Sequence, residues 1–255
     1  MTLLVRRGSS GVPGAGVTRV RVTPAPPNTF TMATTEKTLE ELEQEAIDAL
    51  AFGGRRARSK VFYSALGALF VNTNQQQRAI DEYRKIVERR PDSAAIYTLI
   101  GMLEMNLQNI DAAIDNYRKA LAIDQNAIFA ANNLAWLYAQ HGKGNLDEAV
   151  RLAQTAVQAN PEVPSFVDTL GWVYYKKGLY AAAAEQLKKA ATVDENAARR
   201  NNLSPSPTYR YHLGVALAAK GDKAGARREI ETALRLAEKS PFPEADEAKK
   251  ALGTL

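Results

Sequence analysis

The chain has 255 residues, of which 45% are hydrophobic and 24% are charged, the balance of an ordinary globular protein. It contains no cysteine, which excludes disulfides, thiolate metal sites, cysteine nucleophiles and a lipid-modified N-terminal cysteine. No apolar run reaches the roughly 18 residues of a membrane-spanning helix, so we expect no membrane span.

The net charge of +5 comes mostly from the beginning of the chain. The only charged side chains before Glu36 are four arginines, which leave a net charge of about +1 for all the other residues. These arginines are Arg6, Arg7, Arg19 and Arg21. A nucleic-acid-binding domain needs a basic face, and the near-neutral remainder does not offer one. We therefore expect no nucleic-acid partner.

Residues 1–35 are rich in Gly, Pro, Ser, Thr and Arg, and this composition predicts a disordered N-terminal extension. The apolar run Leu3–Val5 is too short for the core of a secretory signal, so we favour a cytoplasmic location. The arginine-rich, acid-free composition is also that of an organellar transit peptide. We favour plain disorder, or an extension upstream of a start at Met32, over a transit peptide.

A helix that caps the N-terminal end of the fold is predicted for residues 36–54. Thr38 and Glu41 have the spacing of a capping box, and Gly53 would end the helix. Its apolar stripe consists of Leu39, Leu42, Ala46 and Leu50.

From residue 60 to residue 240 the chain repeats one pattern of apolar and small side chains. In residues 164–197, two stripes with helical spacing flank a turn at Gly178, which predicts a helix, a tight turn and an antiparallel helix. The stripes are Val167, Leu170, Gly171 and Tyr174, followed by Ala183, Leu187 and Ala190. The small residues are expected where the two helix backbones approach closely.

The pattern recurs five times. A small residue in the first stripe recurs with spacings of 34, 34, 36 and 43 residues, at Gly67, Gly101, Ala135, Gly171 and Gly214. An alanine recurs in the second stripe, at Ala79, Ala113, Ala149, Ala183 and Ala226. Prolines close the first and third copies, at Pro91 and Pro161.

This order of small residues, aromatic residues and closing prolines, with its 34-residue period, resembles the tetratricopeptide repeat family. The resemblance implies an all-α, right-handed α-solenoid of five helix-turn-helix units with a helical cap at each end. The expected units are 60–93, 94–127, 128–163, 164–197 and 207–240, followed by a C-terminal capping helix in 241–255. The nine extra residues between the last two units, 198–206, are expected to form a loop.

No catalytic constellation is visible. The two histidines, His141 and His212, lie far apart in sequence, and no HExxH, phosphate-binding glycine loop or nucleophile elbow is present. We therefore expect no enzyme activity, no metal site and no cofactor.

The resemblance also implies a binding surface, because the first helices of this family line the concave face of the superhelix. Carried over by repeat position, the candidate groove residues are Met102, Met105, Asn132, Asn133, Trp136, Asp168, Trp172, Tyr175 and Tyr211. Asn133 resembles the asparagine with which some repeats hold a peptide backbone.

Trp136 and Trp172 are the only tryptophans and occupy the same repeat position, 36 residues apart. We interpret them as neighbouring exposed rings in the groove. The alternative is that they pack against the next helix as core. The groove is favoured because Leu134 and Leu170 already fill the core stripe.

These observations predict a non-catalytic module that binds a protein or peptide segment in its groove. The alternative is a structural or self-associating scaffold subunit of a bacterial envelope or export assembly. In support of that alternative, Tyr211–Gly214 and Phe242–Ala245 resemble the endings of bacterial repeat proteins of this kind.

Binding of a chaperone tail through a carboxylate clamp is not expected. The first unit has Ser64 and Ala68 where the clamp of this family needs lysine and asparagine. Phe129, Ser165 and Thr208 stand at position two of units three to five, where one lysine is needed.

Overall fold

The computed structural model describes residues 2–5, 18–21 and 76–255 and divides into two units, Met1–Pro91 and Asp92–Leu255. In the first unit, strands β1 (Thr2–Val5) and β2 (Thr18–Arg21) pair antiparallel, and helix α3 spans Gln76–Arg89. The strands contain β-branched and leucine residues, which favour extended backbone within a segment whose composition predicts disorder. The rest of that segment and the predicted helix 36–54 lie outside the described residues.

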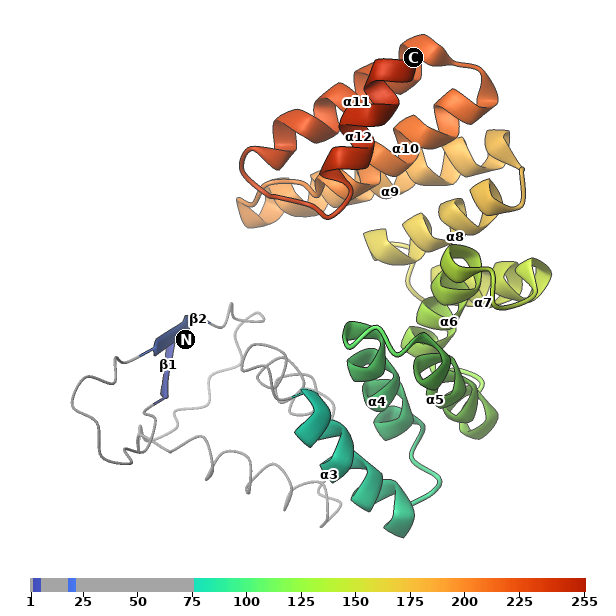
Figure 1. Cartoon of the computed structure of the whole chain (residues 1–255), viewed down its shortest axis with the longest axis vertical. Helices are drawn as coiled ribbons and strands as arrows, with labels where there is room; N and C mark the ends of the chain where they lie inside the picture. The colour runs from blue at the N-terminus through green and yellow to red at the C-terminus, as the bar shows by residue number, and fades with distance from the viewer. Residues whose placement is uncertain (1, 6–17, 22–75) are drawn as a thin grey trace. The chain divides into compact units, whose positions relative to one another are not determined.

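The second unit is entirely helical (Figure 1). Its helices are α4 (Ala94–Asn106), α5 (Ile110–Ile123), α6 (Ile128–His141), α7 (Leu146–Ala159), α8 (Pro164–Lys176), α9 (Tyr180–Asn201), α10 (Pro207–Lys220), α11 (Lys223–Ala237) and α12 (Ala245–Thr254). Helices α4 to α11 form four helix pairs, which fall on the second to fifth predicted units. Over the described residues, none of the helices is both long and apolar enough to span a bilayer.

The helix pairs stack with a consistent asymmetry. Each first helix packs against its own second helix, and each second helix packs against the next first helix. The first helices also contact one another along the series α4, α6, α8 and α10. Within Asp92–Leu255 the second helices make no comparable contacts among themselves. The first helices therefore share one side of the solenoid, which we call the first-helix face: the side chains of α4, α6, α8 and α10 that are not buried in the core.

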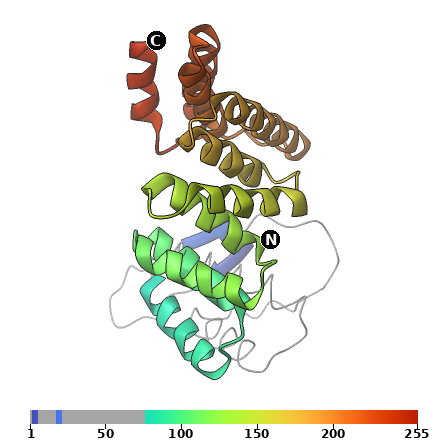
Figure 2. The same cartoon turned by 90° about the vertical axis from the view of Figure 1, so that its right-hand side faces the viewer.

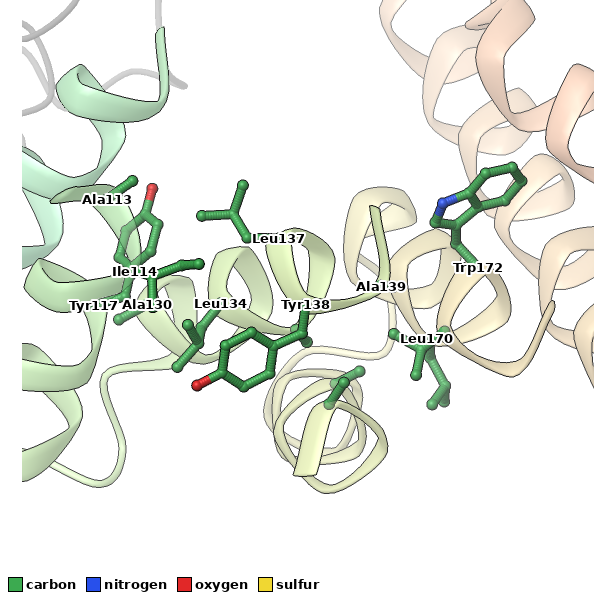
Figure 3. Close-up of a cluster of buried hydrophobic side chains, with 14 of the residues drawn as sticks. Ala113, Ile114, Tyr117, Ala130, Leu134, Leu137, Tyr138, Ala139, Leu170 and Trp172 are labelled. Carbon is green, nitrogen blue, oxygen red and sulfur yellow. The ribbon is translucent and has the colours of Figure 1, made fainter. Parts of the chain in front are cut away.

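Close approach inside each pair explains the recurring small residue. A Cβ atom at Gly101, Gly171 or Gly214 would lie 2.6 Å from a side-chain carbon of the opposite helix. The opposing residues are Tyr117, Leu187 and Ile230, respectively, and all three are fully buried. Figure 3 shows Tyr117 in the buried cluster that continues through Leu134 and Tyr138 to Leu170.

Successive pairs are also joined by a repeated side-chain hydrogen bond. Arg118 Nε donates to the Tyr138 hydroxyl at 2.9 Å, and Gln154 Nε2 donates to the Tyr174 hydroxyl at 3.2 Å. The two bonds occupy equivalent positions in successive repeats. The first bond joins an exposed arginine to a fully buried tyrosine, and the second joins two half-buried side chains.

The first four of the extra residues between the fourth and fifth units, 198–201, extend a helix, so the prediction of a loop is wrong for them, whereas residues 202–206 form the connection to the next helix. Helix α9 continues to Asn201 and ends at Asn202, which is left-handed with φ of 54°. Alanines in this segment favour the helical conformation, and the positive charges of Arg199 and Arg200 in its last turn interact favourably with the helix dipole.

The extended end of α9 is tied to α10 by polar contacts. The Ser206 backbone N–H donates to Asp194 Oδ2 at 2.6 Å. The Arg210 guanidinium donates to Glu195 and also, at 2.6 Å, to Glu229 of α11.

The C-terminal helix α12 packs on α11 (Figure 2). Phe242, which precedes it, and Ala248 are buried with Ile230 and Ala233 of the last pair. The apolar surface that a further repeat would cover is therefore occupied by α12.

Gly171→Ala is expected to lower the free energy of unfolding by about 1–3 kcal/mol, because the added methyl group overpacks against Leu187. The measurement is urea unfolding followed by circular dichroism. Gly253→Ala is the control, since no atom lies within 4 Å of a Cβ at that helical position. Equal midpoints for the two variants would contradict the close-approach argument.

Asp194→Asn is expected to stabilise the fold at neutral pH. Burial is the main influence on the carboxyl and raises the pKa of Asp194, while the Ser206 N–H bond acts in the opposite direction. The carboxyl of Asp194 therefore binds a proton more readily in the folded than in the unfolded chain. Its contribution to the free energy of unfolding is complete at pH values below the ordinary pKa of 3.8, and it is lost as pH rises through the raised pKa of the folded state.

We expect the urea midpoint of Asp194→Asn to exceed that of wild type at pH 7 and to match it at pH 3. Asparagine keeps an acceptor for Ser206. Asp124→Asn is the matched control, because Asp124 also accepts a backbone N–H, from Asn126, but is exposed. A lower midpoint for Asp194→Asn at pH 7 would show that the charge itself stabilises the junction.

Candidate functional site

Aromatic rings of the last three repeats form one connected set, which we call the aromatic cluster: Trp136, Trp172, Tyr175, Tyr211, His212 and Phe242. The ring centres of Trp136 and Trp172 are 6.1 Å apart, and Trp172 stacks on His212 at 4.3 Å. Tyr175 stacks on Trp172 at 4.9 Å. Tyr211 lies 6.0 Å from both His212 and Phe242. The cluster thus joins α6, α8 and α10 to the segment before α12.

Trp172 is an internal member of this cluster, so the expectation that it is exposed in a groove is wrong. Only 8% of the residue is accessible. Its indole Nε1 donates to Gln140 Oε1 at 2.9 Å, and Lys176 Nζ lies 5.1 Å from the ring centre. The alternative interpretation, packing against the neighbouring first helices, describes Trp172 correctly. Trp136, its partner in the pattern, is half-buried.

Asp168 is also buried, against the expectation that it faces a ligand. Its carboxylate oxygens lie 2.9 and 3.0 Å from Nδ1 of His212, which is buried as well. An ionised carboxylate can only accept, so the hydrogen of this bond is on Nδ1. Burial and the negative charges of Asp168 and Asp194 together raise the pKa of Tyr209, which keeps this neighbouring phenol neutral.

The two asparagines of α6 form a hydrogen-bonded chain with the core. Asn133 Nδ2 donates to the Tyr117 hydroxyl at 3.1 Å, and Asn132 Nδ2 donates to Asn133 Oδ1 at 3.2 Å. Burial raises the pKa of the Tyr117 phenol, which stays a neutral hydroxyl. Asn133 is therefore bonded within the protein, unlike the peptide-holding asparagine that it resembles. Asn132 is 6% exposed, and its Oδ1 has no hydrogen-bond partner in the described part of the chain.

The other predicted groove residues are accessible. Met102 is 38% exposed, and four more are half-buried: Met105, Trp136, Tyr175 and Tyr211. Phe129, which stands at position two of its unit, is 50% exposed and packs edge-on against Phe166 at 5.5 Å. The first-helix face therefore presents Met102 and Phe129 as large apolar side chains, with the aromatic cluster behind part of it.

Sequence reasoning missed the Asp168–His212 pair. The two residues are 44 positions apart, at different positions of neighbouring units, and no sequence motif surrounds either of them. Within residues 76–255 no three His, Asp or Glu side chains gather in a way that could hold a metal ion.

Antiparallel helix pairs that stack in series, with small residues at each crossing, define a helical-repeat solenoid. Sequence profiles of the tetratricopeptide repeat match residues 62–93, 94–126, 132–198 and 191–241. The chain therefore belongs to the tetratricopeptide repeat family. Proteins of this family are typically non-catalytic scaffolds for protein interaction.

Solved structures show the same fold at low sequence identity. MamA (residues 41 to the end) from Desulfovibrio magneticus RS-1 has a TM-score of 0.57 and 16% identity, over 72% of this chain and 97% of its own. TTC0263, a thermophilic tetratricopeptide repeat protein of Thermus thermophilus, has a TM-score of 0.57 and 18% identity, over 76% of this chain and 98% of its own. PilF of Pseudomonas aeruginosa has a TM-score of 0.55 and 21% identity, over 83% of this chain and 89% of its own. A comparison with curated protein sequences finds no match.

His212→Phe is expected to lower the free energy of unfolding by about 3–5 kcal/mol, because it leaves the Asp168 carboxylate buried without a partner. Phenylalanine keeps a ring against Trp172, so the variant isolates the polar contact. Adding Asp168→Leu should recover much of the loss, since the buried charge is then gone. Urea unfolding of the single and double variants provides the measurement, and a single variant as stable as wild type would contradict the role of the pair.

Proposed function

We propose that this chain is a non-catalytic interaction module that binds a segment of a partner protein on its first-helix face. The observation that carries the proposal is the exposure of Met102 and Phe129 on neighbouring first helices. Exposed large apolar side chains on one face are typical of protein-binding surfaces.

The accessible side chains suit recognition of a protein segment. Methionine has three rotatable bonds and a polarizable sulfur, so Met102 and Met105 can adapt to different apolar groups. Trp136, Tyr175 and Tyr211 are half-buried, and rings held in this way provide contact area at little entropic cost.

The aromatic cluster and the Asp168–His212 pair serve this face by holding it rigid. Trp172 contacts rings or polar groups from α6, α8 and α10, which fixes the spacing of three first helices. A surface that is rigid before binding loses less conformational entropy when a ligand attaches. We therefore assign Trp172, Asp168 and His212 a positioning role.

Self-association through the second helices or the ends is the alternative. At the C-terminal repeat, Phe242 and α12 already cover Ile230 and Ala233, which are therefore not available for self-association. Ile123 and Leu203 are exposed apolar residues away from the first-helix face, and they provide matched controls.

The test is affinity capture from the source cell's lysate with the wild-type chain and two double variants. Met102→Lys with Phe129→Lys places charges on the first-helix face and is expected to reduce retention of specific partners at least about tenfold. Ile123→Lys with Leu203→Lys removes two exposed apolar residues elsewhere and should retain the same partners as wild type. The exposures of Met102 and Ile123 are 38% and 39%, which makes the comparison fair.

Circular dichroism melts must show that both variants are folded. Retention of the same partners by the Met102/Phe129 variant would overturn the proposal. The scaffold alternative would be favoured if the wild-type chain sediments as an oligomer and the Ile123/Leu203 variant, but not the Met102/Phe129 variant, sediments as a monomer.

A further inference from the structure

We infer that the segment bound on the first-helix face is uncharged and extended, and that it is held by apolar side chains and backbone amides. This inference rests on the proposed function and specifies the chemistry of its ligand. It sets this chain apart from modules that recognise an acidic or a basic tail.

The distribution of charge over the helices is strongly uneven. The first helices α4, α6, α8 and α10 contain five Asp, Glu, Lys or Arg residues in all: Glu104, Asp168, Lys176, Arg210 and Lys220. The second helices α5, α7, α9 and α11 contain twenty. Charge is therefore concentrated away from the face proposed to bind the ligand.

The few charges of the first helices are compensated or lie at helix ends. Glu104 is buried and accepts from Asn109 Nδ2 at 2.8 Å, and Asp168 is bonded to His212. Arg210 is bonded to Glu195 and Glu229. Lys176 and Lys220 lie in the last turns of α8 and α10, where their positive charges interact favourably with the negative end of the helix dipole.

A charged ligand side chain would find no counter-charge along the middle of this face. It would lose hydration on binding without an ion pair in return, which opposes binding. Apolar side chains meet Met102, Phe129 and Trp136 without such a penalty. The composition of the face therefore discriminates against charged segments.

Asn132 supplies a polar group that suits a backbone. Its Oδ1 accepts no hydrogen bond in the described part of the chain, although only 6% of the residue is exposed. An unsatisfied buried acceptor costs free energy that a donor recovers. In an uncharged extended segment, the donors present at every residue are backbone N–H groups. Asn132 lies between Phe129 and Trp136 in α6, so a backbone bound there would place its side chains near both rings.

The experiment is a selection of displayed random peptides of about 12 residues against the full chain. We expect the enriched peptides to be depleted in Asp, Glu, Lys and Arg relative to the input and rich in large apolar residues. Their affinity should change less than about twofold between low and high salt, because no ion pair forms. Affinity should fall at least about tenfold with Phe129→Lys and be unchanged with Ile123→Lys.

Asn132→Leu tests the acceptor separately. Leucine has a similar shape but no acceptor, so affinity for the enriched peptides should fall about fivefold to tenfold, while the urea midpoint changes little because removal of the unsatisfied acceptor offsets the lost bond to Asn133. An unchanged affinity would overturn the assignment of Asn132, and a lowered midpoint with unchanged affinity would make it purely structural.

The outcomes separate the two proposals. Enriched peptides that are acidic or basic, bind on the first-helix face and weaken with salt would overturn this inference and leave the proposed function standing. Peptides that bind equally to the Phe129→Lys variant, or no enrichment at all, would overturn the proposed function.

Discussion

The close approach of the two helices in each pair is the constraint on which the rest of this structure depends. Gly101, Gly171 and Gly214 have no side chain because Tyr117, Leu187 and Ile230 fill that space. Close packing inside the pairs lets each second helix also cover the next first helix. The first helices are then left with one shared face, and its apolar residues become available to a ligand. A single steric requirement, repeated along the chain, thus leads to both the solenoid and its candidate binding surface.

Much of the fold follows from local sequence, because the repeat period and the helical stripes depend on residues within one unit. The described turns illustrate this: the left-handed position after the first helix is Gly142, Gly178 and Gly221 in the third to fifth units, and it is the non-glycine Gln108 in the second. The extension of α9 was not predictable from the period, because its residues have no counterpart in the other units. Their helix propensity, with Arg199 and Arg200 at the end, was the available signal.

The candidate site was less predictable, since exposure depends on side chains from several repeats at once. Trp172 occupies the same repeat position as Trp136, yet it also contacts Gln140 and Lys176, and its ring centre is 4.3 Å from that of His212, against 5.8 Å for Trp136. Asp168 has a groove position by count but is paired with a histidine of another repeat. Met102 needed no such partner, and its exposure agrees with its position in the pattern.

The junction between the last two repeats differs in kind from the earlier ones. The tyrosines that receive a hydrogen bond at the preceding junctions, Tyr138 and Tyr174, are replaced by Leu217 in α10. There the polar contacts are made by carboxylates, Asp168 with His212, and Asp194 and Glu195 with the start of α10, beside a buried apolar cluster that α9 and α10 share. Nearest-neighbour coupling decides how cooperatively a solenoid unfolds. Added salt therefore weakens the partly exposed contacts of Arg210 with Glu195 and Glu229 at this junction, whereas the buried Asp168–His212 pair is screened much less and keeps the last two repeats coupled.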